Sequence, residues 1–230
     1  WTGNIEGCTD ELSCNYNDEA NFDDGSCDYS CHDNGDYSLS FNGTDNSVQG
    51  ASLSLDDVSE TNLLTFSAWV KPDVDNSMRR VFSYYPTDST SQQYAVAVDY
   101  GKIYFLAGLS DQFEQGQGNI GESILAINEW SHIAVTYDDE AVRFYVNGEL
   151  DFEHYVDATF DAINEGEFYI GSNSVWNSHT NSYQVFDGLI KDIKIFNAAF
   201  TDSEIQDFFN TNTLSHESNL LADWRFNSGQ

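Results

Sequence analysis

The chain has 230 residues, of which 39 are Asp or Glu and only 8 are Lys or Arg, so its formal net charge is -31. A field this negative repels phosphate backbones and anionic lipid surfaces, which excludes unspecific nucleic-acid binding and electrostatic membrane docking. Aromatic residues make up 15% of the chain, so we expect a folded core and not an acidic disordered chain. No apolar run approaches the ~18 residues of a membrane span. The start at Trp1 lacks a signal segment and predicts a mature or excised piece of an exported protein.

All four cysteines lie within the first 31 residues, as Cys8, Cys14, Cys27 and Cys31. An even number in a short, loop-rich segment predicts two disulfides that hold together a module too small to build its own core. A zinc site is the alternative, but zinc favours Cys-x2-Cys pairs, and gaps of five, twelve and three residues fit poorly. Disulfides imply an oxidising, extracellular compartment. We expect a cysteine-rich acidic module over residues 1–36 and a second domain over residues 37–230.

The same segment is rich in side-chain oxygens, and no Lys or Arg precedes Lys71. Side-chain oxygens recur at nearly every second position before Gly25, at Asn15, Asn17, Glu19, Asn21, Asp23 and Asp24, and of these Asn15, Asn17, Asp23 and Asp24 are candidate metal ligands. Oxygen ligands at nearly alternate positions are what a loop needs to wrap Ca²⁺. The spacing differs from that of an EF-hand loop, because no Glu follows the glycine at the required distance. The alternative is a solvated acidic loop with Asx turns.

Three motifs of this segment occur in a fixed order: Gly7-Cys8-Thr9-Asp10, Cys14-Asn15-Tyr16-Asn17 and Asp23-Asp24-Gly25-Ser26-Cys27. Together they resemble a short cysteine-rich repeat of large secreted surface proteins and adhesins of marine organisms, with the pattern GCTD, CNY and DDGSC. Related copies often keep only the first and last of these three cysteines. The resemblance therefore implies that Cys8 pairs with Cys27, which leaves Cys14 for Cys31.

From Tyr37 onward, short runs of β-branched and aromatic residues are separated by polar turns. Alternation with period two predicts strands with one buried face. Such runs cover residues 64–70, 94–98, 102–106, 132–137 and 142–146, and later strands are expected at 167–171, 188–196 and 220–226. Asn147-Gly148 predicts a two-residue hairpin turn with positive φ at both positions. About twelve strands with so little helix predict an all-β fold, an antiparallel sandwich or jelly roll.

One short helix is predicted near the end of the chain. Thr201-Asp202-Ser203-Glu204 is a capping box, in which the Thr hydroxyl and the Glu carboxylate satisfy each other's backbone amides. Ile205, Phe208 and Phe209 then share one face of a helix that runs to about Asn210, and we expect this face to be core and not a ligand site. Asp56-Asp57 is expected to lie in a turn.

The strand motifs, in order, lie at residues 39–43, 66–72, 130–138, 143–148, 169–171 and 186–200. In this order they resemble the laminin-G-like, concanavalin-A-like jelly-roll family, which includes the pentraxins. The resemblance covers nearly all of residues 37–230. It implies ligand sites on loops at the rim of the sandwich, often beside a calcium ion that bridges to a glycan or to a partner protein.

The loop over residues 172–183 is rich in amide and hydroxyl groups around an aromatic side chain. Its candidate ligand-binding residues are Trp176, Asn177, His179, Asn181 and Tyr183. An aromatic ring stacked on a sugar, with amides reaching the hydroxyls, follows the usual pattern of a few polar groups around an apolar surface. The alternative is an ordinary polar loop whose Trp is tucked inward.

The resemblance also implies a structural calcium ion that ties the first and last strands together. Its ligands would be Asp45, from the loop after Asn42, and Asp187 or Asp192 in the late strand. The family usually has an acidic residue at the position of Lys191, which puts that position's role in doubt. Asn42-Gly43-Thr44 is an N-glycosylation sequon in a predicted turn.

Enzymatic hydrolysis of a glycan is not expected, because retaining hydrolysis needs two carboxyl groups about 5 to 5.5 Å apart. Polysaccharide-cleaving enzymes of this fold place them on a Glu-x-Asp-x-Glu strand, which this sequence lacks. We therefore expect an extracellular recognition or adhesion module, stabilised by Ca²⁺, that binds a glycan or a surface protein. The alternative is a structural subunit of a filament, appendage, surface layer or virion decoration that contacts its own copies or neighbouring modules.

Overall fold

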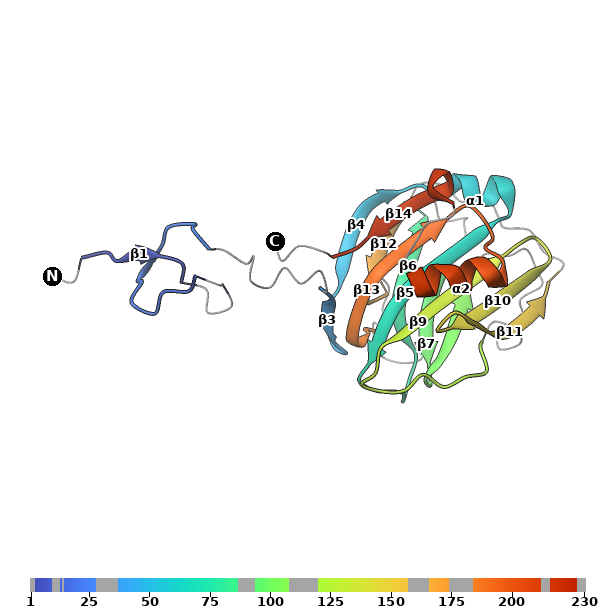
Figure 1. Cartoon of the computed structure of the whole chain (residues 1–230), viewed down its shortest axis with the longest axis horizontal. Helices are drawn as coiled ribbons and strands as arrows, with labels where there is room; N and C mark the ends of the chain where they lie inside the picture. The colour runs from blue at the N-terminus through green and yellow to red at the C-terminus, as the bar shows by residue number, and fades with distance from the viewer. Residues whose placement is uncertain are drawn as a thin grey trace. The chain divides into compact units, whose positions relative to one another are not determined.

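The computed structural model describes residues 3–9, 13, 15–27, 37–86, 94–107, 120–156, 166–173, 184–211 and 216–226. The chain divides into two compact units (Figure 1). One unit is Leu39–Trp224, and the other consists of Trp1–Ser38 and Arg225–Gln230.

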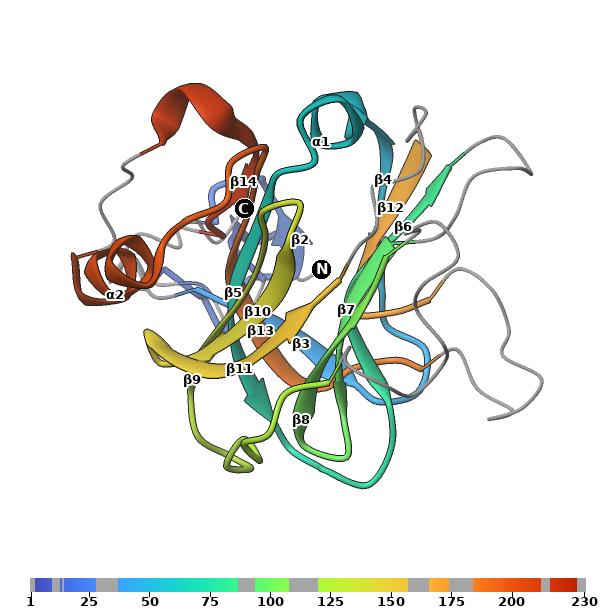
Figure 2. The ribbon, with the colours of Figure 1, turned by 90° about the vertical axis from the view of Figure 1, so that its right-hand side faces the viewer.

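In the described part of the chain, the larger unit is a sandwich of a seven-stranded and a five-stranded antiparallel sheet (Figure 2). The seven-stranded sheet has the order β11-β10-β9-β5-β13, and β3 and β14 both pair with β13. The five-stranded sheet has the order β4-β12-β6-β7-β8. The strands are β3 (Leu39–Asn42), β4 (Val48–Leu53), β5 (Leu64–Pro72), β6 (Arg79–Pro86), β7 (Tyr94–Asp99), β8 (Lys102–Leu106), β9 (Ser131–Tyr137), β10 (Ala141–Val146), β11 (Glu149–Tyr155), β12 (Gly166–Ile170), β13 (Asp187–Phe196) and β14 (Leu220–Trp224). The prediction of an all-β antiparallel sandwich is confirmed.

Aromatic side chains fill the space between the two sheets. Phe66 and Trp224 come from the seven-stranded sheet, and Phe82 and Phe168 come from the five-stranded one. The ring centroid of Phe82 lies 5.8 Å from that of Phe66 and 6.1 Å from that of Trp224. The ring centroids of Phe168 and Trp224 are 4.7 Å apart. The alternation predicted for β5 therefore buries Phe66 between the sheets and turns its neighbours Thr65 and Ser67 outward.

The hairpin between β10 and β11 has the turn that the sequence predicts. Asn147 and Gly148 have φ values of 51° and 82°, and Val146 pairs with Glu149 across them. A Cβ added at Gly148 would lie 2.9 Å from the ring of Phe209. This turn therefore requires a glycine both for its backbone and for the close approach of the ring.

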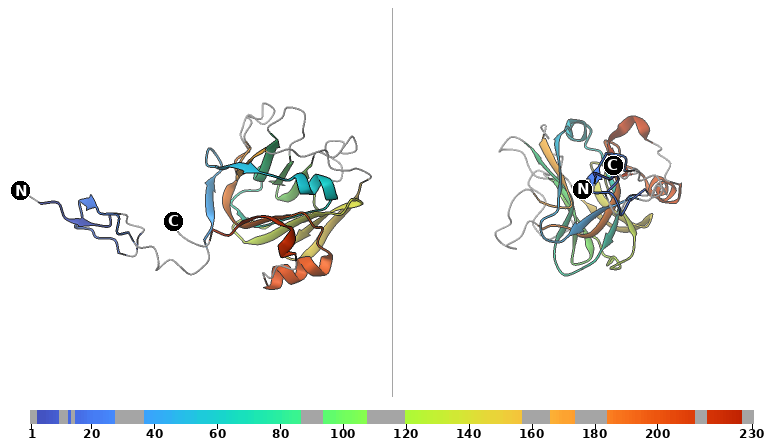
Figure 3. Two further views of the ribbon diagram at one scale, coloured as in Figure 1. Left: turned by 90° about the horizontal axis from the view of Figure 1, so that it is seen from above. Right: turned by 90° about the vertical axis from the view of Figure 1, so that its left-hand side faces the viewer.

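Among the described residues, two α-helices flank the sandwich, where the sequence predicted one (Figure 3). Helix α2 (Asp202–Thr211) has the predicted capping box, since the Thr201 backbone amide donates to Glu204 Oε2 at 2.8 Å. Helix α1 (Asp56–Thr61) was missed, and the expectation of a turn at Asp56-Asp57 is wrong. These two carboxylates occupy the first turn of α1, where the helix dipole favours negative charge. A 3₁₀ helix, η2 (Glu217–Asn219), precedes β14.

Helix α2 lies across the outer face of the seven-stranded sheet (Figure 1). Beneath it a second core contains Tyr145, Phe196, Phe200 and Ile205. Ile205 and Phe208 are buried, so the predicted apolar stripe of this helix is core at those two positions. The helix therefore turns an outer sheet face that would be solvated into a partly buried layer.

Strand β13 contains a β-bulge on this outer face. Lys191 pairs with Trp69 of β5, but Lys194 pairs with Ser67, so one extra residue lies between the two registers. Asp192 has a φ of 51°, in the left-handed region that Asp tolerates better than most residues. Because of the extra residue, both lysines face outward although they are three positions apart.

His132 of β9 is buried in this layer. Its Nε2 lies 2.8 Å from the Ser67 hydroxyl, and 1% of the residue is exposed. Burial, together with the nearby charge of Lys194, lowers the pKa of His132 to about 4. The imidazole is therefore neutral in the folded protein at physiological pH, whereas in the unfolded chain it titrates near the usual value of about 6.5.

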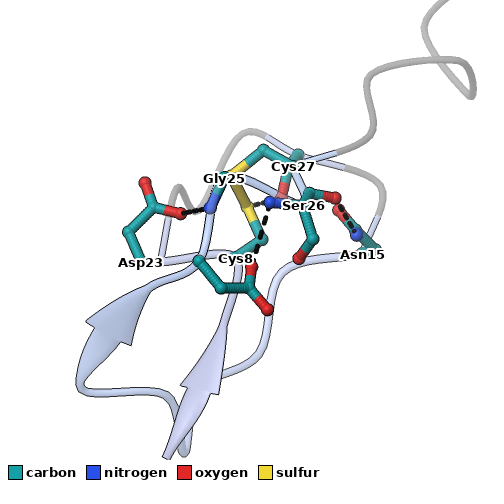
Figure 4. The surroundings of a disulfide bond; sticks show 8 residues. Cys8, Asn15, Asp23, Gly25, Ser26 and Cys27 are labelled. Carbon is teal, nitrogen blue, oxygen red and sulfur yellow. Dashed lines mark hydrogen bonds between the residues drawn. A yellow bond between two sulfur atoms is a disulfide. The ribbon is translucent and has the colours of Figure 1, made fainter.

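The smaller unit contains a parallel pair of two-residue strands, β1 (Glu6–Gly7) and β2 (Phe22–Asp23). Cys8 and Cys27 form a disulfide, which confirms the pairing implied by the repeat (Figure 4). Cys14 and Cys31 lie outside the described residues, so their pairing stays a prediction.

We predict that His132 makes the protein less stable in mild acid. Between pH 7 and pH 5 the unfolded chain binds a proton that the folded protein excludes, which lowers the free energy of unfolding by about 2 kcal/mol. Denaturant titrations at the two pH values measure this difference. The variant His132→Asn serves as the comparison, and equal losses in variant and wild type would contradict the prediction.

Candidate functional site

Of the predicted binding loop over residues 172–183, only Ser172 and Asn173 are described. Trp176, Asn177, His179, Asn181 and Tyr183 lie outside the described residues, so their role stays a prediction. Asn173 and Gln184, which precede and follow the undescribed part, are both buried. Their contacts show where the loop leaves and rejoins the sandwich.

Both ends of this loop are attached to β6. Gln184 Oε1 accepts a hydrogen bond from Arg80 Nε at 2.8 Å and one from Asn173 Nδ2 at 3.4 Å. The Tyr85 hydroxyl donates to Asn173 Oδ1, and the Arg80 backbone amide donates to the Gln184 carbonyl at 2.8 Å. The loop therefore begins and ends beside the five-stranded sheet.

The outer face of that sheet presents aromatic and polar side chains together. Tyr85 and Tyr169 lie on β6 and β12 with ring centroids 5.9 Å apart in an edge-to-face arrangement. Glu167 Oε2 accepts hydrogen bonds from the Tyr169 hydroxyl at 3.0 Å and from Gln49 Nε2 at 3.2 Å. Burial and the neighbouring Glu167 raise the pKa of Tyr169, so its hydroxyl stays a donor at neutral pH. We define the outer-face site as Gln49, Tyr85, Glu167 and Tyr169.

A buried arginine lies next to this site. Only 5% of Arg80 is exposed, and its Nη1 has no hydrogen-bond partner among the described residues. Burial lowers the pKa of Arg80, and burial likewise raises the pKa of Asp99, whose charge Arg80 partly offsets. The sheet therefore holds a buried positive charge next to the outer-face site.

The outer-face site has the chemistry of a binding surface more than that of a hydrolase. Tyrosine rings can stack on the C–H face of a sugar, while an amide and a carboxylate exchange hydrogen bonds with its hydroxyls. Among the described outward residues of this sheet, the carboxylates are Glu167 and Asp99. Glu167 pairs with Tyr85 and Val98 pairs with Arg79, so the two carboxylates are separated by about 20 Å along β6. These two cannot form a catalytic pair.

The predicted calcium ligands of the sandwich lie at two different places. Asp187 approaches the turn after β3, because a Cβ added at Gly43 would lie 2.7 Å from its Oδ2. Asp45 Oδ1 accepts from Asn42 Nδ2 at 2.9 Å in the same turn. Asp192 is five positions further along β13, roughly 16 Å away. Arg79 Nη1 donates to the carbonyls of Gly43 and Val185 at 3.0 Å each, and so already ties the two segments together.

The candidate oxygens of the small unit take part in local turns (Figure 4). Asp23 Oδ1 accepts from the Gly25 amide at 3.0 Å, and Asp24 Oδ1 accepts from the Ser26 amide at 2.9 Å. Asn17 Oδ1 accepts from the Glu19 amide at 3.1 Å, and Asn15 Nδ2 donates to the Ser26 carbonyl at 2.7 Å. The bonds of Asp23, Asp24 and Asn17 are the Asx turns of the alternative interpretation, whereas the bond of Asn15 joins two distant parts of the segment. Within the described ranges, no group of three or more His, Cys, Asp or Glu gathers as a metal site.

The chain belongs to the concanavalin A-like lectin/glucanases superfamily, since a laminin G domain model of that superfamily matches residues 34–206. This confirms the resemblance of the larger domain, whereas the resemblance of the cysteine-rich segment stays a prediction. A search of the curated proteins finds no match. Among the described residues, no helix is long and apolar enough to cross a membrane.

Several solved structures share the fold. A candidate carbohydrate binding protein from Bacteroides ovatus is 17% identical with a TM-score of 0.58, covering 84% of this chain and 52% of that one. The CBM40 domain of a Ruminococcus gnavus IT-sialidase is 12% identical with a TM-score of 0.53, and the match covers 72% of this chain and 97% of that domain. A SAP-like pentraxin from Limulus polyphemus is 15% identical with a TM-score of 0.50, and the match covers 75% of this chain and 81% of the pentraxin chain. The chain thus spans about half the length of the Bacteroides protein.

The outer-face site was missed at the sequence level because β4 and β6 were not predicted. The register of β6 shifts between Arg80 and Phe82, so Val81 is an extra residue and the alternation of the strand is broken. The sequence signal that could have predicted this part of β6 is the alternation of Ser83 and Tyr85 with the inward-facing Phe82 and Tyr84.

We predict that Tyr85→Phe weakens the attachment of the loop. The substitution removes the hydroxyl that Asn173 accepts from and leaves a buried amide oxygen without that donor, which should lower the free energy of unfolding by about 1 kcal/mol. Denaturant titration measures the change. Tyr100→Phe, in the exposed turn between β7 and β8, is the control and should change stability by less than about 0.5 kcal/mol. Equal effects would contradict the prediction.

Proposed function

We propose that the sandwich is an extracellular recognition module that binds a glycan at the outer-face site. The observation that supports this most directly is the pair of tyrosine rings beside Glu167 and Gln49, next to the attached ends of the polar loop. Membership of a lectin-containing superfamily agrees with it. The similar structures named for carbohydrate binding, from Bacteroides ovatus and Ruminococcus gnavus, agree as well.

The charge and the disulfide narrow this proposal. A formal charge of -31 disfavours polyanionic ligands, so we propose that the glycan is neutral. The Cys8–Cys27 disulfide suits an oxidising compartment and supports secretion or display at a surface. The wide separation of Glu167 from Asp99 supports binding without hydrolysis, because it leaves those carboxylates too far apart to act together.

We predict that Tyr169→Ala lowers glycan affinity by about tenfold or more, because it removes a stacking ring and the hydroxyl that orients Glu167. A glycan array with wild-type protein, followed by calorimetry with the ligand found there, measures the loss. Tyr155→Ala is the control, since Tyr155 is an exposed tyrosine on β11 of the other sheet. Absence of binding to every neutral glycan, or equal affinity of Tyr169→Ala and wild type, would argue against the proposal.

We further propose that calcium stabilises the corner between β3 and β13, with Asp45 and Asp187 as carboxylate ligands. The proximity of Asp187 to the turn after β3 supports this. Arg79 places a positive charge at the same corner, so we expect only the weak, about millimolar affinity of extracellular calcium modules.

The calcium proposal predicts that a chelator lowers the melting temperature, because an ion bound only to the folded state raises apparent stability. Thermal melting of the wild type with about 10 mM calcium and with chelator measures the shift. This concentration is chosen because it exceeds a millimolar dissociation constant and so populates the bound state. Asp187→Asn should abolish most of it, whereas Asp207→Asn, an exposed carboxylate on α2, should leave it unchanged. An unchanged melting temperature for the wild type would remove calcium from this corner.

A further inference from the structure

The outer face of the seven-stranded sheet contains a pocket of about 270 Å³. Its lining residues come from helix α2 and from β5, β13 and the start of β9, so the pocket lies on the seven-stranded sheet and the outer-face site on the five-stranded one. Seven side chains from four parts of the fold line it: Trp69, Trp130, His132, Lys191, Asp192, Phe208 and Phe209. A volume just below the ~300 to 1,000 Å³ of pockets for drug-sized ligands suits a single small ring more than an extended chain.

Aromatic rings form most of the wall of this pocket. The Trp69 ring lies 5.6 Å from Phe209 and 5.4 Å from His132, and the rings of β5, β9 and α2 therefore hold one another in place. Lys191 Nζ lies 4.7 Å from the centre of the Trp130 ring. Trp69 and Trp130 are only half-buried, so both have surface that a ligand can cover.

The polar groups of the pocket are placed by the bulge of β13. The extra residue of the bulge lies between the two registers of β13, and Lys191 and Asp192 at this bulge both line the pocket. An ammonium offers three hydrogen-bond donors and a carboxylate about four acceptor positions, so both can serve a ligand in addition to contacts within the protein. At the floor, His132 Nδ1 is buried and has no hydrogen-bond partner among the described residues.

The charges of these groups cancel. Lys191 is positive, Asp192 is negative, and the imidazole of His132 is neutral, so the pocket is uncharged within a chain of formal charge -31. An anion would be repelled by the surrounding field. A purely apolar ligand would displace water from the ammonium and the carboxylate and offer no hydrogen bond in exchange, which is costly. A neutral ring that carries several hydroxyl groups avoids both penalties.

We propose that this pocket is a second ligand site, distinct from the outer-face site, and that it takes one neutral pyranose ring. The ring would stack on the exposed surface of Trp69 or Trp130, while its hydroxyls accept from Lys191 and donate to Asp192. With two sites on opposite sheets, one copy of the domain could hold two glycans at once. The proposal does not depend on the outer-face site, so either can fail alone.

The test uses the full chain and four free sugars: glucose, galactose, mannose and N-acetylglucosamine. NMR titration of the indole signals of Trp69 and Trp130 is expected to show binding by at least one sugar with a dissociation constant of about 1 mM, as suits a ligand of this size. Lys191→Met keeps the aliphatic stem over Trp130 but removes the donors, and should weaken binding about tenfold or more. Lys102→Met, which removes the same charge from β8 of the other sheet, should bind as the wild type does.

Three outcomes would overturn the proposal. The first is that none of the four sugars moves the two indole signals. The second is that Lys191→Met binds as tightly as wild type; loss of the same binding in Tyr169→Ala would then assign the sugar to the outer-face site. The third is that N-acetyltryptophanamide binds and the sugars do not, which would make the pocket a receptor for an apolar side chain of a protein partner. Binding lost in Lys191→Met but kept in Tyr169→Ala supports the pocket independently of the proposed function.

Discussion

Strand β13 pairs with three other strands, and the rest of the domain depends on that pairing. Along one edge it pairs with β5, and along the other it pairs first with β3 and then with β14. The first and last strands of the sandwich are thus held by the same strand. The bulge that separates Lys191 from Lys194 falls between the segments that pair with β3 and β14. This bulge therefore separates the segment that pairs with β3 from the segment that pairs with β14, and its residues Lys191 and Asp192 line the pocket beside α2.

The two outer faces of the sandwich differ in whether their polar side chains are buried or exposed. On the seven-stranded sheet, α2 covers Ser67, His132 and Lys194, and burial has to be compensated. Lys194 Nζ lies 3.5 Å from Asp223 Oδ1 on the neighbouring strand, and His132 stays uncharged. The attraction within a buried ion pair does little more than offset the cost of removing both charges from water, so this pair is weak evidence for added stability. On the five-stranded sheet Gln49 and Glu167 remain exposed, and their hydrogen-bonding capacity is available to ligands.

Local signals in the sequence predicted the parts of the fold that depend on local chemistry. The Asn147-Gly148 turn and the Thr201–Glu204 capping box each involve a few consecutive residues, and both were found. Helix α1 was missed because a single buried residue, Val58, gives no helical periodicity. In β13 the inward residues Ile190 and Ile193 are three positions apart instead of two, which is a usable sign of the bulge.

The candidate sites could not be predicted in the same way, because they are assembled by tertiary pairing. Tyr85 and Tyr169 belong to strands far apart in sequence, and only the register between β6 and β12 brings their rings together. The pocket beside α2 depends on tertiary structure even more strongly. Trp69, Lys191 and Phe209 meet there because a bulge, a glycine turn and a capped helix all place side chains on one sheet face. The sequence predicts Phe209 to be a core residue. In the structure it also lines the pocket, because the sheet places Trp69 and Lys191 beside it.

The edge of β13 has one more consequence, which concerns how this domain fits into longer chains. Trp224, the end of β14, pairs with Ile193, and Leu39, the start of β3, pairs with Ile190. Both strands run in the same direction, so β14 points toward the start of β3 along a single line, with about 10 Å between their ends. A polypeptide can therefore enter and leave the sandwich at nearly one point. Such a domain can be inserted into a surface loop of another protein, or circularly permuted by a short bridge, without rearranging either sheet.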